Sequence, residues 1–174
     1  STIQWRLTGA RAMKKGSKTN AIRYLEKLGI PHERLEYEMD SEDLSALHVA
    51  EVSGIPIDML YKTIVCRGDK TGVMLVCIPG DAEVDMKKLA QVSGDKKAES
   101  ISLKEILPLT GYVRGGVSPI GCKRDYPLYI NETVTAKERI SISAGARGCQ
   151  IILKPDDLVN IRNAIVGQIA KEPR

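Results

Sequence analysis

The feature that most constrains the fold is the longest apolar run of the chain, Val73 to Ile78. This run is too short to cross a membrane, which takes about 20 apolar residues. It fits a β-strand that is apolar on both faces and needs cover on each side. The segment Tyr61–Cys66 precedes it, and the Gly-containing turn between them, residues 67–72, predicts a hairpin. We therefore expect this hairpin to lie in the middle of a covered sheet.

Helices and further strands alternate irregularly around this hairpin. The expected helices start at capping residues and stop at glycine or proline, and they run over 19–28, 43–53, 85–92, 102–108 and 155–169. Further strands are expected over 35–39, 139–143 and 149–153, the last two forming a second hairpin. Residues 111–127 are rich in glycine and show no regular period. This mixture indicates an α/β (α+β) fold with a mixed sheet and surrounding helices.

Length and composition predict one domain and exclude several classes of protein. The chain has 174 residues, which favours a single domain over 19–174. Residues 1–18 are basic and are expected to be a flexible extension or a tail added by cloning. With 43% hydrophobic residues and a net charge of only +4, the domain is not intrinsically disordered. Phenylalanine is absent, which argues against the aromatic base-stacking platforms of common RNA-binding domains.

Lys62 is the most unusual residue of the first strand. Strict alternation places it on the same face as Ile64 and Cys66. An ammonium on an apolar face is costly unless it reaches water or faces a cleft. Lys62 is therefore either a lysine that extends to solvent at the start of its strand or a functional group in a cavity.

Two glycine-rich segments could bind an anion. In Gly115–Gly121, paired glycines allow successive backbone N–H groups to point into one concavity, which suits a carboxylate, a phosphate or a developing oxyanion. The alternative is an ordinary turn. In Ser143–Gly148, Arg147 stands between glycines and could either contact a phosphate or lock the turn through a carboxylate.

No residue pair of the sequence suggests nucleophilic catalysis or a metal site. The two histidines, His32 and His48, stand near none of the four cysteines, so we expect no zinc or other metal and no cofactor. The wide spacing of the cysteines favours free thiols in the reducing cytoplasm. Cys122 lies beside Lys123 and Arg124, which could activate it, but a buried inert thiol is the favoured interpretation.

Four ordered motifs resemble those of the YbaK/EbsC proteins, free-standing relatives of the editing domain inserted in bacterial prolyl-tRNA synthetases. The resemblance covers about residues 19–170. The motifs are Tyr61-Lys62-Thr63, Pro79-Gly80 leading to residues 84–89, Thr110-Gly111-Tyr112 leading to Gly115–Gly121, and the segment Ser143–Gly148. The family implies a barrel-like mixed α/β fold and hydrolysis of the ester bond of a mischarged tRNA.

The resemblance also implies roles for individual residues. The catalytic set is Lys62, Gly115 and Gly116. The substrate-binding set is Tyr37, Ser45, Val117, Ser118, Pro119, Arg147 and Gln150. Contacts to the tRNA backbone are expected from the cations that flank the glycine-rich segment, Arg114, Lys123 and Arg124. The chain departs from the family at two points: Ser45 or a neighbour replaces a pocket phenylalanine, and Gln150 replaces an aspartate found in some members.

These features predict a trans-editing aminoacyl-tRNA deacylase that removes cysteine from tRNA(Pro). An aminoacyl ester is already activated, so orientation and oxyanion stabilisation can accelerate its cleavage without an enzymic nucleophile. The attacking group would come from the substrate itself. The expected partners are aminoacyl-tRNA and a prolyl-tRNA synthetase, with no membrane and no DNA, in the cytoplasm. The alternative is a non-catalytic module of the same fold that binds the tRNA end or a synthetase.

Overall fold

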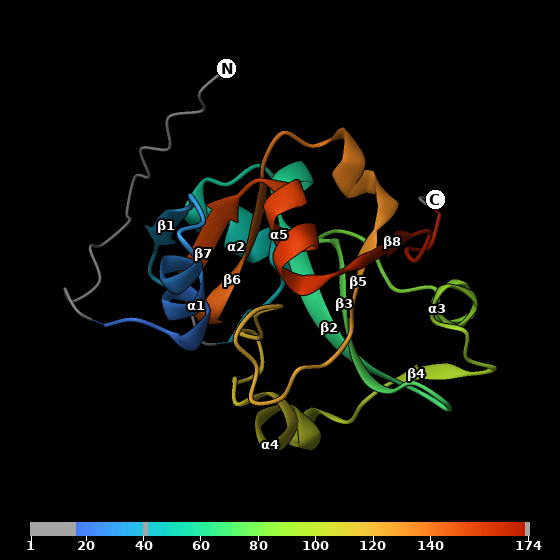
Figure 1. Cartoon of the computed structure of the whole chain (residues 1–174). Helices are drawn as coiled ribbons and strands as arrows, with labels where there is room; N and C mark the ends of the chain where they lie inside the picture. Colours follow the sequence, from blue (N-terminus) through green and yellow to red (C-terminus); the bar gives the residue numbers. More distant parts are fainter. Residues whose placement is uncertain (1–16, 40–41, 173–174) are drawn as a thin grey trace.

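The computed structural model describes residues 17–39 and 42–172 (Figure 1). Most of the expected extension over residues 1–18 therefore lies outside the described residues. The helices are α1 (Asn20–Leu28), α2 (Ala46–Ser53), α3 (Met86–Ser93), α4 (Ile106–Thr110) and α5 (Pro155–Arg162). None of the helices in the described ranges is long and apolar enough to cross a membrane.

The strands form two sheets. In the first, β1 (Glu33–Glu36), β7 (Cys149–Leu153) and β6 (Ile140–Ala146) are antiparallel and stand in the order β1-β7-β6. The second has the order β4-β2-β3-β5-β8. Its members are β2 (Tyr61–Gly68), β3 (Gly72–Pro79), β4 (Ala98–Ser100), β5 (Leu128–Asn131) and β8 (Ile165–Gly167).

The central hairpin and the mixed sheet are confirmed. β2 and β3 are antiparallel, whereas β5 runs parallel to both β3 and β8. β3 is the middle strand, and its residues from Met74 to Ile78 are inaccessible to solvent, as an apolar strand covered on both faces must be. The barrel is not closed: between described residues the two sheets are joined by an isolated bridge from Leu60 to Ser141.

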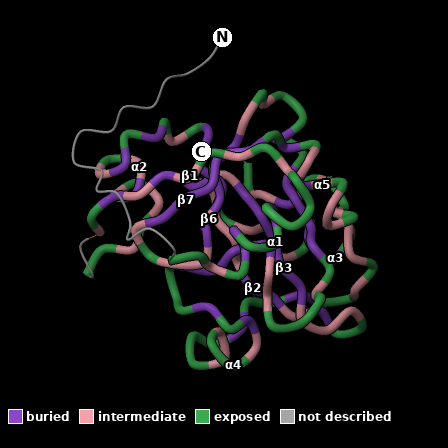
Figure 2. The backbone as a smooth tube through the Cα atoms, turned by 60° about the vertical axis from the view of Figure 1, so that its left-hand side comes forward, coloured by how far each residue is buried: buried purple, intermediate pink, exposed green. Residues whose placement is uncertain are grey.

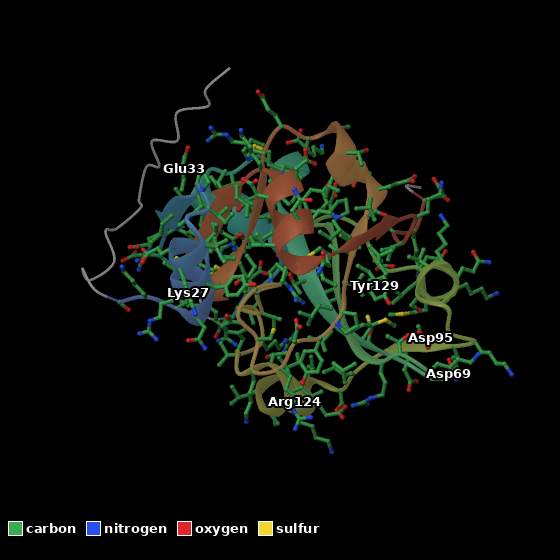
Figure 3. The ribbon with its side chains drawn as sticks, viewed as in Figure 1. Lys27, Glu33, Asp69, Asp95, Arg124 and Tyr129 are labelled. Carbon is green, nitrogen blue, oxygen red and sulfur yellow. The ribbon has the colours of Figure 1, made fainter. Side chains whose placement is uncertain are left out.

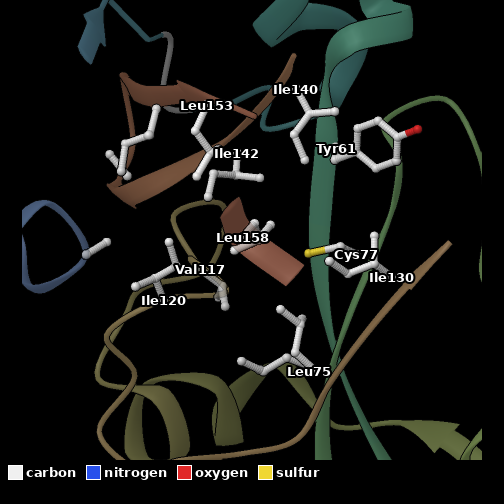
Figure 4. Close-up of a cluster of buried hydrophobic side chains, with 14 of the residues drawn as sticks. Tyr61, Leu75, Cys77, Val117, Ile120, Ile130, Ile140, Ile142, Leu153 and Leu158 are labelled. Atoms are coloured by element: carbon white, nitrogen blue, oxygen red, sulfur yellow. The ribbon is translucent and has the colours of Figure 1, made fainter. Parts of the chain in front are cut away.

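The core has separate clusters on the two faces of β2 and β3. The larger cluster fills the space between the sheets and is capped by Leu158 of α5 (Figure 4). A second cluster lies under α3 and contains Cys66, Ile78 and Leu89. In Figure 2 the buried parts of the chain follow the strands, and most exposed parts are loops and outer helix faces. The alternation of β2 thus faces two distinct cores, with Tyr61 in one and Cys66 in the other.

The expected C-terminal helix over 155–169 is too long. α5 ends at Arg162, because Asn163 adopts a left-handed conformation with φ of 49°. Ile165–Gly167 then forms strand β8, and Ile169 is buried in the cluster under α3. The apolar residues whose spacing resembles one helical face therefore lie in three places: in α5, in β8 and in the cluster under α3.

Three other boundaries also differ from the prediction. The cap of α2 is Ser45, whose hydroxyl accepts the N–H of His48, and the carboxylate of Asp43 accepts the N–H of Ser45 instead. α4 continues through Pro108 and ends at a left-handed Gly111. The strand expected over 35–39 is regular only over Glu33–Glu36, although the N–H of Tyr37 still donates to the carbonyl oxygen of Gly148.

Candidate functional site

A cavity of about 320 Å³ opens where the two sheets, α2 and the loops on either side of α4 meet. Leu60 and the first residues of β2, 61–65, form one wall, and the other walls are mostly apolar. Those other walls consist of Leu44, Ala46, Val49, Ser100, Ile101, Leu103, Ile106, Arg114, Gly115, Val117, Ser143 and Gln150. Among the residues expected to act, Lys62, Gly115, Val117, Gln150 and Arg114 thus lie around one space.

Lys62 supplies the ammonium of this cavity. It is partly buried at the start of β2, on the face that Ile64 shares, as the alternation predicts. Burial lowers the pKa of Lys62 below its ordinary value, and the carboxylates of Glu83 and Asp81 partly oppose that shift. Within the described chain no carboxylate comes within ion-pair distance of Lys62. Its charge therefore remains available to a ligand.

The glycine-rich loop faces the cavity through Gly115 and Val117. Gly115 has φ of 81°, a conformation that suits glycine. Gly116 differs from it, because its N–H donates to the carbonyl oxygen of Val113, and a Cβ on it would lie 3.2 Å from backbone atoms of Ala146 and Arg147. Gly116 therefore lets the loop pack against the β6–β7 turn, and it is Gly115 that borders the ligand space.

The two residues after Val117 lie behind the cavity wall. Ser118 is fully buried, and its hydroxyl accepts the N–H of Ile120. Pro119 is buried as well and presents its carbonyl oxygen to α5. In the structure both residues support the loop, whereas the family resemblance implies that they bind substrate.

Arg162 of α5 ties the far end of this loop, and no pattern in the sequence singles it out. Its Nε donates to the carbonyl oxygen of Pro119 at 2.8 Å, and its Nη2 donates to that of Tyr126. Nη1 lies 2.7 Å from the carboxylate of Asp125, while the arginine side chain is only 11% exposed. One side chain thus fixes two points of a segment that has no regular secondary structure.

Gln150 provides the polar group of the opposite wall. Its Oε1 accepts a hydrogen bond from the hydroxyl of Ser141 at 3.0 Å, and its Nε2 donates to the hydroxyl of Tyr37 at 3.2 Å. Burial raises the pKa of Tyr37 to about 12, so this hydroxyl stays neutral. Tyr37 does not line the cavity, but its hydroxyl orients the amide of Gln150, which does.

The remaining expected residues stand outside the cavity. Ser45 caps α2, while its neighbours Leu44 and Ala46 line the wall. Arg147 is exposed, and its Nε donates to the carbonyl oxygen of Arg114 at 2.8 Å. Lys123 and Arg124 are exposed near α4, where Figure 3 labels Arg124. Arg147 thus contacts the cavity-lining Arg114, whereas Lys123 and Arg124 are not part of the cavity wall.

The cysteine thiols are poorly suited to act as nucleophiles. Burial raises the pKa of Cys122 to about 11, although Arg162 lowers it slightly, and burial raises the pKa of Cys77 to about 12. A thiol that keeps its proton is a weak nucleophile, which agrees with the inert role expected for Cys122. Over residues 17–39 and 42–172, no three His, Cys, Asp or Glu side chains gather in a group that could hold a metal ion.

Comparisons with known proteins give the chain relatives over most of its length. The model of the family described as "Aminoacyl-tRNA editing domain" matches residues 42–161. The Enterococcus faecalis protein named "Putative Cys-tRNA(Pro)/Cys-tRNA(Cys) deacylase EbsC" is 43% identical over 158 residues, which are 91% of this chain and 94% of that protein. A proline–tRNA ligase of Lactobacillus gasseri is 28% identical over 128 residues, which are 70% of this chain and 22% of the ligase.

A solved structure shares the fold. The crystal structure described as "a putative trans-editing enzyme for prolyl tRNA synthetase" superposes with a TM-score of 0.76 at 22% identity and covers 90% of this chain and all of that one. At 22% identity, this likeness shows that the two proteins share a fold and shows nothing further.

Proposed function

This chain belongs to the aminoacyl-tRNA editing domain family, and on that premise we propose that it is a trans-editing deacylase that removes cysteine from mischarged tRNA(Pro). The family model spans most of the domain, and a 43% identical relative carries the name of a Cys-tRNA deacylase. The observation that carries the proposal is the single cavity whose wall contains both Lys62, a partly buried lysine, and Gly115 of the glycine-rich loop.

The cavity suits a small aminoacyl group on a large nucleic acid. Its volume of about 320 Å³ is at the lower end of ligand sites, which span roughly 300–1,000 Å³. Its walls are mainly Leu, Ile and Val, which favour a small, weakly polar side chain such as that of cysteine. An apolar pocket distinguishes side chains by only about 1–3 kcal/mol per methylene, so alanine and serine esters should be attacked more slowly but measurably.

In our proposal the substrate provides its own nucleophile. The cysteine thiol attacks its carbonyl carbon, the ester C–O bond breaks, and the released ribose oxygen takes up the thiol proton; water then opens the thiolactone. With other small side chains, the neighbouring ribose hydroxyl directs a water molecule to the same carbon. In both cases negative charge develops on the carbonyl oxygen, where Lys62 and the loop N–H groups stabilise it.

The remaining residues would position the two ends of the substrate. Gln150, held by Tyr37 and Ser141, would contact the aminoacyl group, and Arg114 would contact the terminal phosphates. Lys123, Arg124 and Arg147 would guide the tRNA backbone. We propose that recognition of tRNA(Pro) comes from a complex with prolyl-tRNA synthetase and that the protein works in the cytoplasm, where both occur.

The test is a deacylation panel with Cys-, Ala-, Ser- and Pro-tRNA(Pro). We expect fastest release of cysteine, slower release of alanine and serine, and none of proline. Lys62→Ala should lower the rate about 10²–10³-fold, the usual cost of one preorganised charge contact. Lys87→Ala, an exposed lysine of α3, is the matched control and should leave the rate unchanged. Binding of tRNA without any acceleration of ester cleavage would instead support the non-catalytic module.

A further inference from the structure

The outer face of α4 and of the 3-10 turn that precedes it, Leu103–Glu105, exposes two leucines; this turn and α4 together form the α4 segment, residues 103–110. Leu103 is 59% exposed and Leu107 is 55% exposed. They stand four residues apart and so share one side of a helical turn. Ile106, between them, is packed against the main core. We call Leu103 and Leu107 the α4 shelf.

The shelf adjoins the cavity described above. Leu103 belongs to the cavity wall, as does Ile106 on the next turn. Leu107 follows Ile106 directly and is not part of the cavity wall. The shelf therefore begins in the cavity wall at Leu103 and includes an exposed leucine outside that wall.

Cations surround the shelf. Lys104 is exposed on the same turn, and Arg114 lies in the cavity wall. Lys123 stands at the end of α4, where its N–H donates to the carbonyl oxygen of Thr110 at 2.9 Å. The carboxylate of this segment, Glu105, is already bound by Arg67 at 2.9 Å and by Ser102. The shelf thus combines apolar surface with a positive border.

We infer that the α4 shelf seats the unpaired nucleotides at the 3′ end of the tRNA, next to the aminoacylated ribose. Single-stranded nucleic acid binds where bases contact exposed apolar side chains, most strongly aromatic ones, and cations contact the phosphates; the exposed leucines of the shelf offer the weaker, non-aromatic form of this contact. A protein partner would suit the leucines alone but would give no reason for the cationic border. The inference rests on the proposed function, because the substrate must enter the same cavity.

The experiment measures the affinity of uncharged tRNA(Pro) by fluorescence anisotropy, with an intact 3′ end and with the last three nucleotides removed. Truncation should weaken binding to the unaltered protein about threefold to tenfold, somewhat less than stacking on aromatic side chains gives. Leu107→Ala should weaken binding of the intact tRNA by a similar factor and leave the truncated tRNA unaffected. Leu107→Tyr should tighten binding of the intact tRNA only.

A matched control separates the shelf from exposed leucines in general. Leu28→Ala changes a leucine of α1 that is 47% exposed and should behave as the unaltered protein with both tRNAs. Equal effects of Leu107→Ala on intact and truncated tRNA, or no effect on either, would overturn the inference. This binding experiment uses uncharged tRNA and does not depend on deacylation. A protein that fails to deacylate in the separate panel would refute the proposed function, while the binding data would still show whether the shelf contacts the 3′ end.

Discussion

Replacing Arg162 tests how the glycine-rich loop is held. Arg162→Ala removes two hydrogen bonds from a charged donor to the carbonyl oxygens of Pro119 and Tyr126. Each such bond contributes about 1.5–3 kcal/mol, so the free energy of unfolding should fall by about 3–6 kcal/mol. The ion pair with Asp125 adds little, because that carboxylate side chain is 95% exposed. The domain should remain folded if its stability is near the upper part of the usual range of about 5–15 kcal/mol.

The functional loss follows from the same contacts. Without them the segment before Pro119 can shift, and a displacement of about 1 Å at a reacting group can cost on the order of 10²-fold in rate. Urea unfolding gives the stability, and kcat/KM for Cys-tRNA(Pro) gives the rate. Arg162→Lys keeps the charge, but the lysine can bind one of the two carbonyl oxygens at most. Its loss of unfolding free energy should therefore be about half of the loss caused by Arg162→Ala. Asp125→Ala is the control, with an expected change below about 1 kcal/mol. If Arg162→Ala unfolds at the same urea concentration as the unaltered protein, the hydrogen bonds of Arg162 to Pro119 and Tyr126 do not stabilise the fold.

Three further perturbations test individual contacts. Burial lowers the pKa of Lys62, so between that lowered pKa and 10.5 the unfolded chain binds a proton that the folded chain has released. The free energy of unfolding should therefore rise with pH in this window. Lys62→Met should remove this rise when urea unfolding is measured at a series of alkaline pH values. Gly116→Ala places a Cβ 3.2 Å from the backbone of Ala146, and urea unfolding should show a loss of about 1–3 kcal/mol, whereas an unchanged midpoint would mean that the turn yields freely. Burial alone would raise the pKa of Asp95, but hydrogen bonds from Ser93 and Thr71 outweigh it and lower the pKa to about 2. Stability from Asp95 should therefore be lost as the pH falls from about 3.8 to about 2, and Asp95→Asn should flatten that part of an acid titration.

The hairpins are predicted because their partner strands are close in the chain, whereas β1 is predicted from its own alternation although its partner β7 is distant. Both hairpins are predictable because a turn signal stands between two matching strands, as at residues 67–72. The strands β4, β5 and β8 escape prediction: each is short, and each pairs with a strand far away in the chain. Asn163 is equally hard to foresee, since a left-handed asparagine ends α5 without a glycine or proline.

The same distinction holds for the candidate site. Lys62 and Gly115 are visible in the sequence because each breaks a local pattern, an apolar face in one case and a regular period in the other. The cavity residues Ser100 and Ile101 break no pattern, and only the pairing of β4 with β2 brings them to the wall. Arg162 stands on a helix where an arginine is ordinary. Its role depends on carbonyl oxygens that α5 meets only after folding.

The separation along the chain between the glycine-rich loop and Arg162 has a consequence during translation. The ribosome releases the glycine-rich loop first, and Arg162 follows about 40 residues later, which takes roughly 2–8 s at ordinary elongation rates. Until α5 emerges, the nascent polypeptide can pair β2 with β3 but has nothing to hold Pro119 and Tyr126. The cavity beside the glycine-rich loop is therefore expected to be completed only after α5 has left the ribosome, and products terminated before α5 would lack the contacts that hold this loop.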